Sequence, residues 1–193
     1  YDGASAMAEA MMMGKHVAED KWRKEDRNTL LLAGAHNPEY EEVVRTYAHA
    51  AGIKVVNVPA GADGRIDAAA LKTALTRKVF AVAVQSPNYL GVIEDVESVN
   101  QARTESEALL IQCIAEPLSL ALLQTPAEAG VDIAVGEGQP LGNHQFLGGP
   151  AFGFFAARKE HLRKMPGRIV SETVDRNGKR AFALALATRE QHI

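Results

Sequence analysis

The stretch IAVGEGQPLGNHQFLGGPAFGFF, residues 133–155, is the segment around which the rest of the chain is organised. It begins as a short apolar strand, breaks at Gly136 and enters a second apolar strand at Ala151. The fifteen residues of the loop 136–150 include five glycines and two prolines. Glycine lets a backbone approach a ligand or another chain closely, and proline fixes its path. Because a loop of this length is uncommon inside a compact domain, we expect it to have a functional role.

The loop 136–150 carries polar side chains but no lysine. They are one carboxylate, three amides and one imidazole: Glu137, Gln139, Asn143, Gln145 and His144. The nearest lysines before and after the loop are Lys78 and Lys159. Carboxylates and amides form hydrogen bonds with a ligand, whereas an imine requires an amine. The loop therefore has groups that bind a ligand but no lysine that could bond to it covalently.

The segments on either side of the loop alternate between strand and helix patterns. Continuous apolar runs predict strands at residues 29–33, 53–58, 79–84, 108–114, 131–135 and 151–157. Helices are predicted at residues 1–13, 38–51, 67–76 and 95–107, with a short apolar helix after Pro117 and a solvated turn at 14–28. This rhythm indicates βαβ units and a mostly parallel sheet covered on both faces. In such sheets ligands bind beyond the carboxyl ends of the strands.

Composition limits the class of protein. The chain has 193 residues, 47% of them hydrophobic, and a net charge of −3, which fits an α/β domain and gives no sign of a nucleic-acid or anionic-membrane binder. The single cysteine, Cys113, excludes an internal disulfide and fits a reducing cytosol. No apolar run approaches the ~18 residues of a membrane span. The chain starts without methionine, and residues 188–193 read as the start of a helix, so we expect a domain truncated at both ends.

The entrance of the first helix is a candidate anion site. Asp2, Gly3, Ala4 and Ser5 are small or capping residues at a helix start. Free backbone N–H groups at such a position favour a phosphate or a carboxylate. The alternative is an ordinary N-cap in which Asp2 satisfies the first turn, and this is what most helices need.

Three further candidates follow strand ends. His36 could stack on a planar ligand or move a proton, or could simply bond to local backbone. Asn88 could hold a ligand hydroxyl or form an Asx turn. Glu116 follows a buried run, so it needs a cationic partner or a ligand nitrogen, unless it serves as a helix N-terminal carboxylate before Pro117. Cys113 is expected to be a buried apolar residue, and no spacing indicates a metal site.

Five segments carry a family resemblance. YDGASAMAEA, HNPEYEEVVRTYA, QSPNYLGVIEDVE, GEGQPLGNHQFLGGPAFGFFA and MPGRIVSETVDRNGKRAFALALATREQHI together resemble the glycine cleavage P-protein, glycine dehydrogenase (decarboxylating). The variant YDGASA favours subunit 1, the alpha chain of the split form. The resemblance covers the whole chain and implies the aspartate-aminotransferase fold (fold type I). Residues 1–193 would then form a single three-layer α/β/α large domain with a mostly parallel sheet, without the N-terminal region and the C-terminal small domain.

The resemblance also implies an activity. The family decarboxylates glycine held as an imine of pyridoxal phosphate (PLP), which acts as electron sink, and transfers the aminomethyl group to the lipoyl arm of H-protein. The implied partners are glycine dehydrogenase subunit 2 and lipoylated H-protein, in a cytoplasmic heterotetramer of glycine catabolism. The resemblance implies that PLP and its lysine belong to subunit 2, so this chain would be a structural or regulatory subunit, inactive alone. The alternatives are an autonomous PLP-dependent transferase or desulfurase, and a non-enzymatic scaffold.

Site residues are carried over by position. Counting back from Gly149 and Pro150 puts Gln139 approximately at the Schiff-base lysine position, so no catalytic residue is expected in this chain. The candidate cofactor contacts are Gly3, Ala4 and Ser5 at the phosphate, His36 stacked on the ring, Asn88 at the ring hydroxyl and Glu116 at the pyridine nitrogen. An aspartate is usual at the last position, which is a second departure from the family pattern. We therefore expect a vestigial pocket without PLP.

Overall fold

The computed structural model describes residues 1–145, 147 and 149–185. These residues form two compact units, divided after Ala156. The predicted helix opening at residues 188–193 lies outside the described residues.

The first unit is built on a six-stranded sheet in the order β2-β1-β3-β4-β5-β6. The four neighbouring pairs from β2 to β5 are all parallel. The strands are β1 Thr29–Ala33, β2 Lys54–Val58, β3 Val79–Gln85, β4 Leu109–Ile114, β5 Ile133–Glu137 and β6 Gly153–Ala157. β3 and β4 are buried over their whole length, which explains their continuous apolar sequence. The predicted mostly parallel sheet is confirmed.

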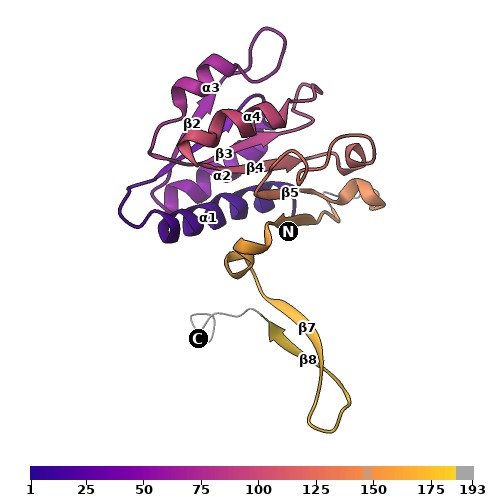
Figure 1. Ribbon diagram of the computed structural model, residues 1–193. Helices are drawn as coiled ribbons and strands as arrows, with labels where there is room; N and C mark the ends of the chain where they lie inside the picture. Colours follow the sequence, from indigo (N-terminus) through magenta and orange to yellow (C-terminus); the bar gives the residue numbers. More distant parts are fainter. Residues whose placement is uncertain (146, 148, 186–193) are drawn as a thin grey trace. The chain divides into compact units, whose positions relative to one another are not determined.

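Helices cover both faces of this sheet, as Figure 1 shows. They are α1 Gly3–Lys21, α2 Pro38–Ala50, α3 Ala68–Ala74 and α4 Val96–Arg103. Three short 3-10 helices follow α4 in the chain: η1 Thr104–Ser106, η2 Pro117–Ala121 and η3 Gln139–Leu141. α1 packs against α2 and against β3, β4 and β5, whereas α3 and α4 contact each other and cover the opposite face. The three-layer α/β/α class is therefore confirmed. No helix in the described part of the chain is long and apolar enough to cross a membrane.

α1 is longer than predicted. The solvated turn expected at residues 14–28 is wrong for its first part, because the helix continues to Lys21. Gly14, Val17 and Ala18 are buried, and a Cβ added to Gly14 would lie 3.5 Å from the ring of Phe80. Within the helix, Glu19, Asp20 and Lys21 are exposed, whereas Arg27, beyond the end of the helix, is buried. A run of charges thus marks one face of a helix here, not its end.

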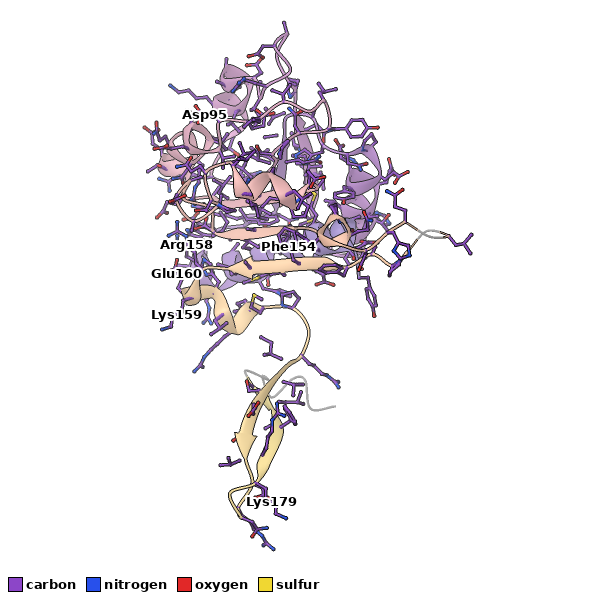
Figure 2. All side chains as sticks on the ribbon, turned by 90° about the vertical axis from the view of Figure 1, so that its right-hand side faces the viewer. Asp95, Phe154, Arg158, Lys159, Glu160 and Lys179 are labelled. Atoms are coloured by element: carbon purple, nitrogen blue, oxygen red, sulfur yellow. The ribbon has the colours of Figure 1, made fainter. Side chains whose placement is uncertain are left out.

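β5 also continues further than predicted. The expected break at Gly136 is wrong, because the strand includes Gly136 and ends at Glu137. A Cβ on Gly136 would overlap the carbonyl oxygen of Ile114 and come within 2.6 Å of the ring of Phe154 in β6 (Figure 2). This glycine therefore permits close packing inside the sheet. It does not interrupt the strand.

The second unit contains the 3-10 helix η4 Lys159–Lys164 and an antiparallel hairpin, β7 Ile169–Val174 and β8 Arg180–Ala185. Sequence reasoning missed this hairpin, although Asn177-Gly178 is a hairpin-turn signal. Lys179 marks its turn end in Figure 2. Glu172 and Arg180 form an ion pair of 2.8 Å on its exposed surface.

Candidate functional site

The candidate site lies at the carboxyl edge of the sheet, where Glu137 at the end of β5 contacts the first turn of α1. The strand order places the crossover between β1 and β3, where open α/β sheets bind ligands. The loops after these two strands are tied together, because the backbone N–H of Asn37 donates to Oε1 of Gln85 at 2.8 Å.

Glu137 is the central residue of this edge. Its Oε2 accepts a hydrogen bond from the backbone N–H of Gly3 at 2.9 Å. Its Oε1 accepts from the N–H groups of Gln139 at 2.8 Å and Phe152 at 3.2 Å. One carboxylate at the end of β5 therefore joins the start of α1, the start of the loop 136–150 and the entry to β6. Sequence reasoning noted Glu137 as a loop carboxylate but gave it no role, since its main partner is 134 residues away.

The first turn of α1 is closed by a second carboxylate. Asp2 is the N-cap, and its Oδ1 accepts from the backbone N–H of Ser5 at 2.7 Å and from the Ser5 hydroxyl at 2.8 Å. The hydrogen bond from the Ser5 N–H, with that from the Ser5 hydroxyl, lowers the pKa of the Asp2 carboxyl against the opposing effect of burial. The N-cap alternative for Asp2 is confirmed. Since Gly3 and Ser5 both donate to carboxylates, their N–H groups are already taken.

Two further groups belong to this region, a half-buried phenol and a buried thiol. The hydroxyl of Tyr40 packs against Gly3, and burial, followed by the proximity of Cys113 and Glu137, raises the pKa of Tyr40 above its usual range. Burial raises the pKa of the Cys113 thiol to about 12, so it is a buried apolar residue as predicted. Sequence reasoning missed Tyr40, because nothing in its helical pattern distinguishes it from a packing residue.

His36 is enclosed by the protein. Its side chain is 4% exposed, Nε2 lies 3.1 Å from the carbonyl oxygen of Ala83, and Nδ1 has no hydrogen-bond partner. Burial lowers the pKa of His36, against the opposing effects of Glu41 and the Ala83 carbonyl. Because both ring faces are covered, a planar ligand could not stack on His36 without rearrangement.

Asn88 is committed to its own turn. Its Nδ2 donates to the carbonyl oxygen of Gly64 and to Oε1 of Glu94, both at 2.8 Å. Its Oδ1 accepts from the N–H groups of Leu90 and Val92, both at 3.0 Å. The Asx-turn alternative is confirmed, and no hydrogen-bonding position of the amide is left for a ligand hydroxyl.

Glu116 is exposed, so the expectation of a buried carboxylate was wrong. β4 ends at Ile114, which places Glu116 two residues beyond the sheet edge. The Glu116 carboxylate caps η2, where Oε1 accepts from the N–H of Leu118 at 3.1 Å. The alternative reading as a helix N-terminal carboxylate is confirmed.

Described residues of the loop 136–150, with Ala151, line an open cavity of about 430 Å³. Gln139 opens η3 inside this loop, and its Nε2 donates to the carbonyl oxygen of Asn143. The described residues that line the cavity are Glu137, Gln139, Gln145, Leu147, Gly149, Pro150 and Ala151. None of these seven has an amine that could form an imine, and Glu137 is the one residue among them with an ionisable side chain.

The described residues do not fit PLP. A cofactor phosphate at α1 would have to displace the carboxylates of Asp2 and Glu137. Asn88 and His36 have their polar or ring surfaces covered, and Glu116 points its carboxylate at backbone. The arrangement is therefore one that holds the loop 136–150 in place.

Comparison with solved structures defines the class. A NifS-like protein is 16% identical with a TM-score of 0.61, and aligns over 82% of this chain and 41% of its own. An apo cysteine desulfurase from Thermococcus onnurineus NA1 is 18% identical with a TM-score of 0.65, over 95% and 44% of the two chains. The chain thus shares its fold with these two proteins.

The family follows from closer matches. The family model described as glycine cleavage system P-protein matches residues 1–193, and the chain belongs to this family. A crystal structure of glycine decarboxylase (P-protein) of the glycine cleavage system, in inhibitor-bound form, is 40% identical with a TM-score of 0.82, over 96% of this chain and 40% of that one. The resemblance inferred from sequence is confirmed.

Curated relatives carry the name of one subunit. Proteins named probable glycine dehydrogenase (decarboxylating) subunit 1 are 44% identical in Anaeromyxobacter dehalogenans (strain 2CP-C) and 46% identical in Carboxydothermus hydrogenoformans (strain ATCC BAA-161 / DSM 6008 / Z-2901), over all of this chain. The chain spans 42% and 41% of the lengths of these two relatives.

Proposed function

We propose that this chain belongs to subunit 1 of a heteromeric glycine decarboxylase in the glycine cleavage system. The complex decarboxylates glycine and transfers the aminomethyl group to lipoylated H-protein. PLP, which supplies the electron sink, and the lysine that holds it are in subunit 2. This chain contributes the fold and the loop 136–150, with Gln139 where the lysine would stand.

The observation that carries the proposal is the set of three hydrogen bonds that the Glu137 carboxylate accepts from the backbone. Its carboxylate occupies the helix N-terminus where the phosphate of a fold type I enzyme would bind. A phosphate would have to break charge-assisted hydrogen bonds worth roughly 1.5–3 kcal/mol each, and would face two carboxylates instead of a cation. The Glu137 carboxylate thus occupies the anion site of this chain. This favours a structural role for the chain beside an active partner.

We propose that this chain contributes to the complex by holding the loop 136–150 in position. Glu137 fixes the start of the loop 136–150 to α1 and to the entry of β6, so the loop is held by rigid elements at its base. The amides of Gln139 and Gln145 line the loop cavity and offer hydrogen bonds without covalent chemistry. We propose that this cavity lies beside the active site of subunit 2 and shapes its wall.

Reconstitution tests the proposal. Full-length subunit 1 is mixed with subunit 2 and H-protein, and the glycine-dependent exchange of CO2 is followed. We expect little exchange with either subunit alone and full exchange with both. If subunit 2 alone matches the mixture, the proposed function is wrong.

A further inference from the structure

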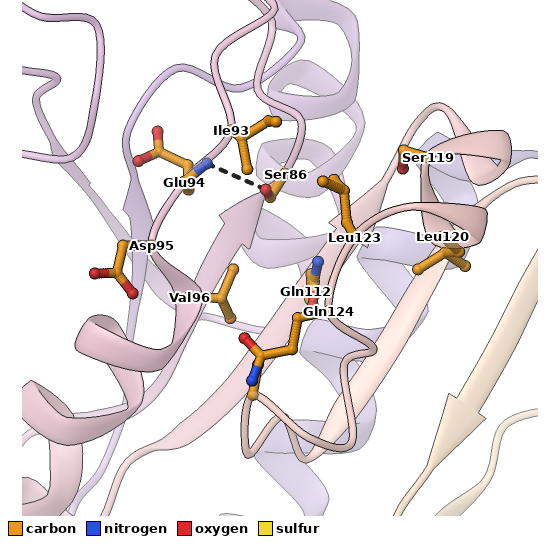
Figure 3. Close-up of a pocket in the computed structure, with 11 residues that line it drawn as sticks. Ser86, Ile93, Glu94, Asp95, Val96, Gln112, Ser119, Leu120, Leu123 and Gln124 are labelled. Carbon is orange, nitrogen blue, oxygen red and sulfur yellow. Dashed lines mark hydrogen bonds between the residues drawn. The ribbon is translucent and has the colours of Figure 1, made fainter.

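The two units of the chain carry net charges of opposite sign. Residues 1–156 contain twelve Lys or Arg and twenty Asp or Glu, which gives a net charge of −8. These acidic residues are spread along the first unit, and two of them, Glu94 and Asp95, lie together at the start of α4 (Figure 3). Residues 157–193 contain nine Lys or Arg and four Asp or Glu, which gives +5. The smaller second unit is therefore basic, although the whole chain is acidic.

Most of this positive charge lies in residues 158–168, RKEHLRKMPGR, here named the basic segment. It has one carboxylate, Glu160, which lies 3.7 Å from Nε2 of His161. Charge of one sign repels itself, so a cluster of cations is most stable when an opposite charge approaches it. The basic segment is thus a candidate contact surface for an anionic partner. Its five cations, for a net charge of +4 with His neutral, are Arg158, Lys159, Arg163, Lys164 and Arg168.

The fold turns part of the basic segment towards solvent. The 3-10 helix η4 has a period of three residues, so His161 and Lys164 lie on one side of it, and both are half-buried. Lys159 and Arg163 are on the other sides and are exposed, as is Arg168 just before β7. Among the described residues, no carboxylate pairs with Lys159, Arg163 or Arg168. These three charges are therefore available to another molecule.

The chemistry of the basic segment fits a protein partner better than a nucleic acid or a membrane. The segment contains no Phe, Tyr or Trp on which a base could stack. η4 has only six residues, too few for a helix that lies in the DNA major groove or in a membrane interface. Arg163 and Arg168, in contrast, can each pair with a carboxylate through two hydrogen bonds, and Arg is enriched in protein interfaces. An acidic protein surface is the partner that these groups match.

The composition of the basic segment also favours a partner that binds and leaves again. Permanent interfaces are large and apolar, and their cores are depleted of charged residues. The basic segment exposes one large apolar side chain, Leu162, which is 37% exposed. Complementary charges mainly raise the rate of encounter, which suits a carrier that must bind in every catalytic cycle. In the function proposed above this carrier is H-protein, which collects one aminomethyl group per cycle.

We propose that the basic segment docks an acidic face of lipoylated H-protein. The inference rests on the proposed function, because it names the surface through which the carrier of that reaction is recruited. Lys159, Arg163 and Arg168 steer the carrier to the complex and pair with its carboxylates. H-protein must then present several Asp or Glu side chains on one face.

A triple charge reversal tests this docking surface. Full-length subunit 1 with Lys159→Glu, Arg163→Glu and Arg168→Glu is assembled with subunit 2, and its binding to immobilised lipoylated H-protein is followed by biolayer interferometry. We expect the association rate constant at ~0.1 M NaCl to fall about 10- to 100-fold, with a smaller change in dissociation. At ~1 M NaCl the Debye length is only ~3 Å, so the variant and the unchanged complex should associate at similar rates. A defect in folding would persist at high salt.

The matched control reverses three exposed cations of the first unit. Lys24→Glu, Arg77→Glu and Lys78→Glu change the net charge by the same amount, and association should stay within about threefold of the unchanged complex. If the test variant does not fold, replacing the same three residues of the basic segment with Gln removes their charge without adding carboxylates. This variant should lower the association rate constant about three- to tenfold.

The outcomes separate this inference from the proposed function. An unchanged association rate in the test variant, an equal loss in the control, or failure of a folded test variant to assemble with subunit 2 would overturn the docking surface alone. The docking surface would also be wrong if the charge reversal abolished binding to a DNA duplex or to phosphatidylserine vesicles, or abolished self-association, and left H-protein binding intact. Salt-sensitive binding of H-protein without any glycine-dependent CO2 exchange in the unchanged complex would instead count against the proposed function.

Discussion

Replacing Glu137 with glutamine tests whether one carboxylate holds the candidate site together. The change conserves shape but turns one acceptor oxygen into a donor. The best orientation keeps Oε1 with the N–H groups of Gln139 and Phe152 and sets the new amino group against the N–H of Gly3. One charge-assisted bond is then lost and two become neutral. Hydrogen bonds to charged groups contribute ~1.5–3 kcal/mol and neutral ones ~0.5–1.5 kcal/mol.

Since Glu137 is only half-buried, we discount the sum and expect a loss of ~2–4 kcal/mol in the free energy of unfolding. Urea unfolding at pH 7, followed by far-UV circular dichroism, measures it. With a slope of ~2 kcal/mol/M the midpoint should fall by about 1–2 M. The matched control is Glu39→Gln, an exposed carboxylate in the first turn of α2, which should change stability by no more than ~0.5 kcal/mol. Equal, small effects of the two variants would refute the reasoning.

Three further predictions concern the same edge. Gly136→Ala should cost ~3 kcal/mol or more in unfolding free energy, because its Cβ would overlap the carbonyl oxygen of Ile114; a loss below ~1 kcal/mol would contradict the packing described. Cys113 should react with a thiol reagent at pH 8 only after unfolding, since burial raises its pKa to about 12; fast labelling of the native protein would be inconsistent with this. The pKa of Asp2 is lowered in the folded state, so its contribution is complete above its ordinary value of 3.8 and is lost as pH falls through the folded value. Asp2→Asn should therefore flatten the acid limb of stability below about pH 4, and an unchanged limb would oppose the assignment.

The buried strands of the six-stranded sheet could be predicted because each is a continuous apolar run in the sequence. β1 and β3 are continuous apolar runs, and their predicted bounds agree with the structure to within one residue. The predicted helix 1–13 ends too early, because the charged residues after Gly14 indicate a turn, whereas α1 continues to Lys21. The β7–β8 hairpin was missed because its two strands are largely exposed and lack a buried apolar run.

The site was harder to predict because its contacts are distant in sequence. The capping residue Asp2 acts within three residues and was recognised as an alternative from the start. Glu137 acts across 134 residues, and no local pattern shows that its partner is Gly3. The end of β4 at Ile114 agrees with the prediction, but the apolar run does not show that Glu116, two residues further on, is exposed. Position in the chain therefore located the candidate residues, but only their tertiary partners show that they are already engaged.

The proposed function depends most directly on which chain carries the cofactor. The reconstituted complex is reduced with borohydride, digested and examined by peptide mass spectrometry for a pyridoxyl-lysine. We expect the modified lysine in a peptide of subunit 2 and none in any peptide of this chain, whose residues 79–158 contain no lysine. A pyridoxyl-lysine in this chain would contradict the account.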